Sequence, residues 1–146
     1  MAEGIYRQSG VIPFRVTPQG PKVLLVTSSS GKRWVIPKGI VEEGLEPDES
    51  AAQEALEEAG IRGLIHLPSV GSYEYSKWGG TCEVEVFLLE VRETLEHWEE
   101  GDVRERRWCT VDEARSLVEE AALKEMIGRL PTLVEERGIA SSNESQ

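Results

Sequence analysis

Residues 39–61 read GIVEEGLEPDESAAQEALEEAGI, and the interpretation of the whole chain starts from this stretch. Its first part is a loop rich in glycine and glutamate, and its second part predicts a helix over Pro47–Ala59. A proline suits the first helical position, and the two acidic residues that follow it favour the positive end of the helix dipole. Gly60 is a natural C-terminal stop for this helix.

The predicted helix has two unlike faces at about 100° per residue. Alanines and a leucine share one half of it, and Glu54, Glu57 and Glu58 share the opposite side. Their i, i+3, i+4 spacing makes the three carboxylates repelling neighbours. Such a face is either a solvated acidic surface or a site for a hard cation such as Mg²⁺, which prefers oxygen ligands. Gly39 favours the cation site, because no side chain hinders approach to its backbone carbonyl.

The remaining pattern predicts an α+β fold, in which helices pack on a mixed sheet. Apolar alternation and apolar runs predict strands over Ser9–Val16, Lys22–Thr27, Arg33–Ile36, Ser69–Tyr75, Thr81–Val91 and Arg106–Thr110. Thr110 and Glu113 have the spacing of a capping box, so a helix should begin at Val111. A last helix is expected within Glu119–Glu136, where Pro131 interrupts or ends it.

Size and charge limit the classes of protein that the chain can represent. Its 146 residues suit one domain, which we expect over residues 1–139, with a disordered tail over residues 140–146. The net charge of −11 argues against a general nucleic-acid binder. No apolar run approaches the roughly 20 residues that span a bilayer, and the start lacks a secretory signal. We therefore expect a cytoplasmic monomer or homodimer with Cys82 and Cys109 as reduced thiols.

Residues 39–61 resemble the Nudix box, G-x5-E-x7-R-E-U-x-E-E-x-G-U, in which U is a bulky aliphatic residue. The box spans 23 residues, so a match is far more specific than a lone glycine pattern. Six residues fall in register, namely Gly39, Glu54, Glu57, Glu58, Gly60 and Ile61. Three positions depart, because Leu45, Gln53 and Ala55 stand where the box has Glu, Arg and the aliphatic residue. An acid and a base are missing together, so the departure leaves no unpaired charge, and Glu46 is an alternative to the missing acid.

The resemblance implies a Nudix α/β/α sandwich over about residues 10–136 and a hydrolase that cleaves diphosphate linkages. It implies that Glu54, Glu57, Glu58 and the carbonyl of Gly39 hold Mg²⁺, with Mn²⁺ as a possible substitute. The cation would activate a water for attack on phosphorus. One of these glutamates, or an acid from the loop 99–105, would accept the proton of the water, and Glu105 is the preferred loop acid.

Basic residues just before the box are candidates for binding phosphate. Lys32, Arg33 and Lys38 cluster there, and Tyr75 is a candidate for stacking on a base. Weaker candidates are Lys77, Arg104, Arg106 and Arg107 for phosphate, and Tyr73 and Trp78 for stacking. Trp34, Trp98 and Trp108 are interpreted as structural.

Segments outside the box extend the resemblance to one subfamily, and this subfamily indicates the substrates to expect. RWVIPKG at 33–39, LEHW at 95–98 and RRW at 106–108 are similar to the diphosphoinositol polyphosphate phosphohydrolases, which also cleave diadenosine polyphosphates. Substrates of that kind are therefore the first expectation. The alternatives are a nucleoside triphosphate or RNA 5′-end pyrophosphohydrolase and a non-catalytic nucleotide-sensing Nudix module. Retention of all three glutamates disfavours the sensing module.

Overall fold

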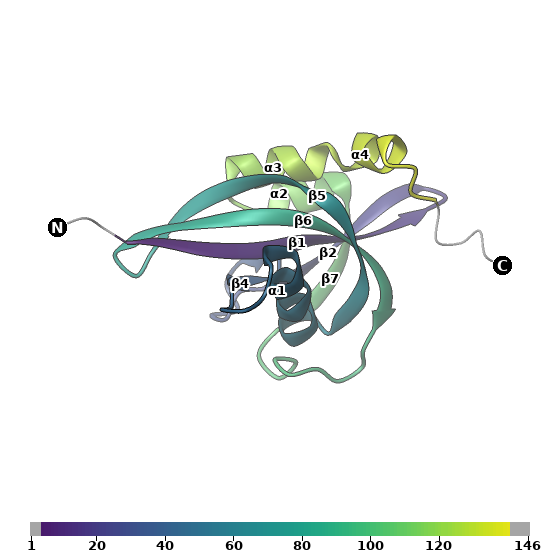
Figure 1. Ribbon diagram of the computed structural model, residues 1–146. Helices are drawn as coiled ribbons and strands as arrows, with labels where there is room; N and C mark the ends of the chain where they lie inside the picture. The colour runs from purple at the N-terminus through teal and green to yellow at the C-terminus, as the bar shows by residue number, and fades with distance from the viewer. Residues whose placement is uncertain (1–3, 141–146) are drawn as a thin grey trace.

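The computed structural model describes residues 4–140, which form a sheet between helical layers (Figure 1). The strands are β1 (Ile5–Thr17), β2 (Gly20–Thr27), β3 (Trp34–Val35), β4 (Lys38–Ile40), β5 (Ile61–Lys77), β6 (Gly80–Thr94) and β7 (Arg106–Thr110). The helices are α1 (Pro47–Glu54), continued by the π-helical turn η1 (Ala55–Ala59), then α2 (Val111–Leu117), α3 (Ala121–Gly128) and α4 (Leu130–Glu136). Between residues 4 and 140, no helix is long and apolar enough to cross a membrane.

The sheet is mixed, as the sequence predicts. Its order is β3-β2-β1-β6-β5, with β4 paired to β1 and β7 paired to β2. The central pair β1–β6 is parallel, and the other pairs are antiparallel. Helices α2, α3 and α4 cover one face and α1 lies on the other, so the predicted α/β/α sandwich is confirmed (Figure 1).

Two apolar clusters hold these layers together. The larger one joins alternate residues of the long strands to α2–α4 and includes Ile12, Phe14, Leu88 and Ile127. The smaller one lies under α1, where Ala51, Ala55 and Ala59 are fully buried. Because these side chains are short, the helix axis approaches the sheet closely.

Several element boundaries differ from the sequence prediction. Strand β5 begins at Ile61 rather than Ser69, because residues 61–66 pair with β6 although their apolar residues do not alternate regularly. Residues 38–40 form β4 instead of a loop, because they pair with β1. The last helical segment divides at Arg129, two residues before the proline at 131, and its first helix starts at Ala121.

Other expectations concern the thiols and the tail. Cys82 and Cys109 are free and buried, as expected for reduced, packed thiols. The capping box of Thr110 and Glu113 begins α2 at Val111, as expected. The tail predicted over residues 140–146 lies, apart from its first residue, outside the described range.

Candidate active site

The helix that carries the acidic residues changes from α to π geometry at Ala55. Gly60 ends it in the left-handed conformation with φ 65°, and its N–H donates to the carbonyls of Ala55 and Leu56. Single π-helical turns are rare and are frequent at functional sites. The wider i→i+5 turn brings residues four apart close to one line along the helix. Glu58 therefore follows Glu54 more closely than regular α-helical geometry would place it.

Two carboxyl groups share a confined space on this line. Glu54 and Glu58 are close enough to share a hydrogen bond when one of them is protonated. The Glu54 carboxyl lies against the backbone of Gly39, where a β-carbon would overlap it. One Glu58 oxygen accepts a hydrogen bond from the Lys38 N–H at 3.2 Å, and the other lies 3.6 Å from an Arg104 nitrogen. Both carboxyl groups are thus held by their surroundings as well as by the helix.

Burial raises the free energy of ionising this pair when no counter-ion is bound. Burial, followed by the charges of Glu58 and Glu57, raises the pKa of Glu54 to about 8. Burial also raises the pKa of Glu58, against the opposing effects of Arg104 and the Lys38 N–H. A divalent cation between the two carboxylates would remove both penalties. The pair beside Gly39 therefore fits the predicted metal site.

The third glutamate points elsewhere. Glu57 accepts a hydrogen bond from the Gln53 side chain at 3.0 Å, four residues before it, along a second line of the helix. Accordingly, no three acidic, histidine or cysteine side chains within residues 4–140 converge as a ready metal cluster. Mg²⁺ often takes one or two carboxylates and completes its shell with water and phosphate, so the pair is sufficient. Glu57 as a metal ligand stays a prediction.

A second polar group near the pair lacks a partner. Ser9 is the antiparallel register neighbour of Gly39, so its side chain lies on the same face of the sheet as the Glu54 carboxyl. Ser9 is fully buried, and its hydroxyl has no hydrogen-bond partner among the described residues. Such a group is normally satisfied by protein or ordered water. The hydration shell of a cation would supply that partner.

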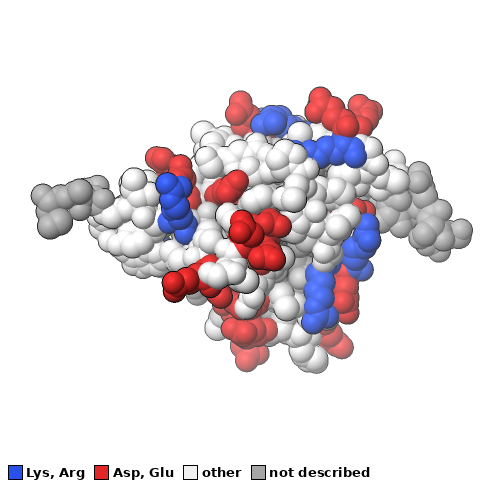
Figure 2. Space-filling view, in the orientation of Figure 1, with Lys and Arg blue, Asp and Glu red and all other residues white. Residues whose placement is uncertain are grey.

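A pocket of about 410 Å³ opens beside Glu58. It is lined by Gln8, Ser28, Ser29, Arg33, Val35, Lys38, Glu58, Tyr75, Ser76, Lys77 and Arg104. Four of these side chains are basic, although the chain has a net charge of −11. Acidic side chains are prominent around α1 on the face seen in Figure 2. The pocket is thus a local basic region in an acidic protein, suited to an anion beside a cation.

Another pocket, of about 430 Å³, lies beside Arg7, Pro47, Ser72, Glu83 and Glu85. It has one basic side chain, which is already paired with Glu83 at 3.1 Å, and none of the box glutamates lines it. Its size alone therefore does not make it the active site. The chemistry favours the pocket beside Glu58.

Arg33, Lys38 and Tyr75 line the pocket, as the sequence analysis expected of substrate-binding residues. The Lys38 ammonium lies 5.3 Å from the centre of the Tyr75 ring, whose hydroxyl donates to the Gln8 side chain at 2.8 Å. Burial lowers the pKa of Lys38. Tyr73, by contrast, belongs to the core.

Two other candidates lie outside the pocket lining. Lys32 is exposed, and its backbone N–H donates to the Ser30 hydroxyl at 3.4 Å. Glu105 is exposed, and its backbone N–H donates to the Thr27 hydroxyl at 2.9 Å. Their proposed roles stay predictions. Gln8 was not expected, because its place follows from long-range strand pairing that no local sequence signal reveals.

The loop 95–105 and the start of β7 hold the end of the acidic helix. The Trp98 indole donates to the carbonyl of Glu58 at 2.9 Å, and the Glu100 N–H donates to that of Glu57 at 3.1 Å. Arg106 donates to the carbonyl of Ala59 at 3.0 Å and stacks 3.9 Å from the centre of the Trp98 ring. These bonds satisfy carbonyls that a helix end leaves unpaired. The structural role expected of Trp98 is therefore confirmed, and it acts on the turn that bears the carboxylates.

Together, the carboxylates of the half-buried Glu54 and the buried Glu58 and the adjoining basic pocket suit a divalent cation and a small phosphorylated molecule. The model of the NUDIX domain matches residues 6–130. The chain therefore belongs to the Nudix family, and it is a Nudix hydrolase, an enzyme of the pyrophosphohydrolase kind. Nudix enzymes generally use divalent metal ions, which agrees with the carboxylate pair.

Similar proteins include several named Nudix hydrolases and one named as a phosphohydrolase. The chain is 35% identical over 124 residues to Nudix hydrolase 16, mitochondrial, of Arabidopsis thaliana, covering 73% of this chain and 68% of that protein. It is 35% identical over 115 residues to diphosphoinositol polyphosphate phosphohydrolase 3-alpha of Mus musculus, covering 77% of this chain and 68% of that protein. It spans 65% and 51% of the lengths of Arabidopsis Nudix hydrolases 13 and 12.

Among solved structures, the fold is similar to that of a C. elegans Ap4A hydrolase in a binary complex. The TM-score is 0.72 at 21% identity, and the match covers 90% of this chain and 98% of that chain. At this identity the likeness supports the fold alone.

We predict that Gly39→Ala reduces the hydrolysis rate at least about a hundredfold, the scale of losing one key electrostatic group. A β-carbon at residue 39 would displace the Glu54 carboxyl. Gly4→Ala is the matched control, since its β-carbon would meet neighbours at ordinary contact distances of 3.4 Å and beyond. Circular dichroism should be native for both variants. Full activity in Gly39→Ala would contradict the predicted arrangement.

We predict that Glu54→Gln stabilises the chelator-treated protein at alkaline pH. Because the pKa of Glu54 rises from 4.5 to about 8 on folding, its contribution to stability is complete below pH 4.5 and is lost as the pH rises through 8. Glutamine resembles the protonated form, so the melting temperature of the variant should exceed that of wild type by a few degrees at pH 9 and match it at pH 4.5. Thermal melts at both pH values, with Glu96→Gln as control, measure this. Equal melting temperatures at pH 9 would show that the carboxyl is not confined.

Proposed function

We propose that this enzyme uses Mg²⁺ to hydrolyse a diphosphate linkage in a small, highly phosphorylated metabolite. The observation that carries the proposal is the pocket, in which Arg33, Lys38, Lys77 and Arg104 gather beside Glu58. Several cations around one pocket suit a ligand with several phosphate groups. Mg²⁺ is the proposed metal because carboxylate oxygens are its usual protein ligands, and Mn²⁺ is the proposed substitute.

In the proposed mechanism the carboxylates hold the metal ion, and the basic side chains of the pocket bind the phosphates of the substrate. Glu54 and Glu58, with Glu57 and the carbonyl of Gly39, would hold the cation. The cation would neutralise the diphosphate and make a bound water more acidic. Lys38 and Arg104 flank Glu58 and would bind the phosphates nearest the scissile bond.

The proton of the attacking water needs an acceptor, and a loop acid is proposed for it. Glu100 is better placed than Glu105, because its charge raises the pKa of both Glu54 and Glu58. Glu100 also accepts a hydrogen bond from Arg104 at 2.8 Å. That bond ties the candidate base to the phosphate-binding wall. Glu105 is retained as the alternative acceptor.

Two classes of highly phosphorylated substrate suit this pocket. Diphosphoinositol polyphosphates are preferred, in line with the name of the mouse relative and with a pocket whose one aromatic lining residue, Tyr75, already has Lys38 over its ring. Dinucleoside polyphosphates are the second candidate, because Tyr75 offers a base a stacking surface once Lys38 turns to a phosphate. RNA ends are less favoured by the charge of −11.

We predict that hydrolysis requires a divalent cation. The carboxylates of the half-buried Glu54 and the buried Glu58 repel a polyanion unless a cation lies between them and it. An excess of chelator should abolish turnover of a diphosphoinositol polyphosphate, and added Mg²⁺ should restore it. Phosphate release is the measurement, and matched ionic strength without chelator is the control. Undiminished turnover in chelator would contradict the proposal.

We predict that specificity constants rise with the number of phosphates in the substrate. Each further charge-assisted contact adds about 1.5–3 kcal/mol in favourable geometry. Diadenosine tetra-, penta- and hexaphosphate, a diphosphoinositol phosphate and ADP-ribose form the series. Lys38→Ala should reduce the constants for the long substrates more than the constant for ADP-ribose.

The control for this series is Lys32→Ala, because Lys32 lies outside the pocket lining and carries the same charge. Equal constants across the series, or a preference for ADP-ribose, would reject the polyphosphate class while leaving the family unchanged. An equal effect of Lys32→Ala would show that net charge, and not the pocket, sets the preference.

A further inference from the structure

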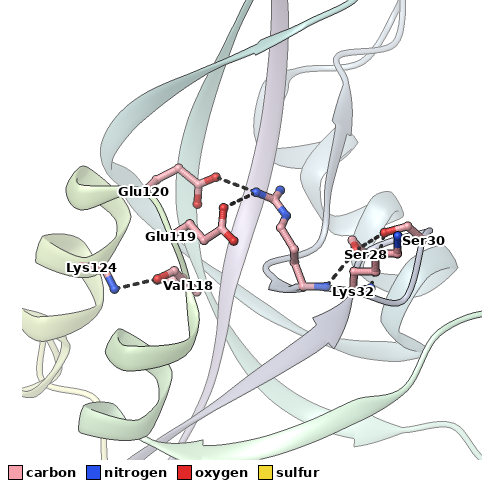
Figure 3. Close-up of polar contacts among 8 residues, drawn as sticks. Ser28, Ser30, Lys32, Val118, Glu119, Glu120 and Lys124 are labelled. Carbon is pink, nitrogen blue, oxygen red and sulfur yellow. Dashed lines mark hydrogen bonds and ion pairs between the residues drawn. The ribbon is translucent and has the colours of Figure 1, made fainter.

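One wall of the pocket is joined to an acidic segment from a distant part of the chain. An Arg33 nitrogen lies 2.7 Å from a Glu119 oxygen and 4.0 Å from a Glu120 oxygen. In Figure 3, dashed lines mark these two contacts, which run from Glu119 and Glu120 toward the loop that carries Ser28, Ser30 and Lys32. Arg33, like Arg104, therefore already has carboxylate partners in the free protein, and those of Arg33 come from a segment outside the pocket lining.

Both sides of this contact are held in place. On the acidic side, the Lys124 ammonium donates to the carbonyl of Val118 at 2.7 Å (Figure 3). It also donates to the carbonyl of Arg115 at 2.7 Å, so the junction of α2 and α3 is held in place. The Val118 side chain is buried in the core. On the loop side, the Arg33 N–H donates to the Ser28 hydroxyl at 3.3 Å. The carboxylates are thus presented by ordered structure.

The second carboxylate lies beside the same arginine and is the less exposed of the two. The Glu120 side chain is only 18% exposed, whereas that of Glu119 is 61% exposed. Glu120 is therefore the less hydrated of the two carboxylates beside Arg33.

We propose that Glu119 and Glu120 are specificity-determining residues that limit how many phosphate groups the pocket accepts at its Arg33 wall. A phosphate that approaches Arg33 must displace Glu119 and come to lie near Glu120. Displacement is feasible because a half-exposed ion pair is weak. Repulsion from the remaining carboxylates then opposes further phosphate groups on this side. This inference rests on the proposed function in one respect, namely that the ligand is polyphosphorylated.

The test measures binding without turnover. Calorimetry with myo-inositol hexakisphosphate, which has no diphosphate linkage, and with orthophosphate would compare wild type with Glu119→Gln, Glu120→Gln and the double variant. The double variant should bind the hexakisphosphate about three- to tenfold more tightly, the scale of one or two exposed charge interactions, and orthophosphate less than about twofold more tightly. Glu125→Gln, an exposed acid of α3 outside the pocket lining, controls for the change in net charge.

A double-mutant cycle identifies the partner. In an Arg33→Ala background, Glu119→Gln should lose most of its effect, because the cation that it releases is absent. Unchanged affinity for the hexakisphosphate, an equal gain from Glu125→Gln, or no measurable binding in any variant would overturn the inference. Turnover of diphosphate substrates is assayed separately. Its absence, together with the predicted binding changes, would reject the proposed function and leave this inference standing.

Discussion

The arrangement of this molecule depends on keeping two carboxyl groups, those of Glu54 and Glu58, together in a partly buried place. Ionised and unaided they repel each other, and burial strengthens that repulsion. The surrounding structure supplies what the pair needs. Gly39 leaves room for one carboxyl, and the Lys38 N–H with Arg104 stabilises the other. The negative charge that these groups leave uncompensated makes the place suitable for a divalent cation.

The structure around the pair brings the helix close to the sheet and fixes the orientation of the two carboxyl groups. The alanine face lets α1 lie near the sheet, so that its carboxyl groups meet the backbone of β4. The π-helical turn aligns Glu58 with Glu54 and sends Glu57 toward Gln53. Trp98 of the loop that follows β6 and Arg106 at the start of β7 then bind the free carbonyls at the end of this turn. Rigid support of this kind is what metal chemistry requires.

Charge is distributed so that an acidic protein can admit an anion. The net charge of −11 is offset locally by four basic side chains around the pocket. One of these, Arg33, is itself balanced by acids from the α2–α3 junction. The pocket therefore combines attraction at its centre with an acidic limit at one wall. The balance between attraction by the basic side chains and repulsion by the carboxylates beside Arg33 then sets the selectivity among phosphorylated ligands.

The sequence by itself determined the family, the mixed sheet and the acidic helix, because the box is a local pattern and apolar periodicity is a local signal. It also indicated Gly39, Lys38 and Arg33 as site residues, since they adjoin the box or belong to it.

Only the tertiary structure separated Lys32 from the pocket and extended β5 to Ile61. The reason is physical, because these features follow from contacts between distant segments. The same holds for the hydrogen bond of Glu57 to Gln53, the place of Gln8 in the pocket, and the contact of Glu119 with Arg33. Periodicity reports which face a residue occupies, whereas packing decides what that face meets.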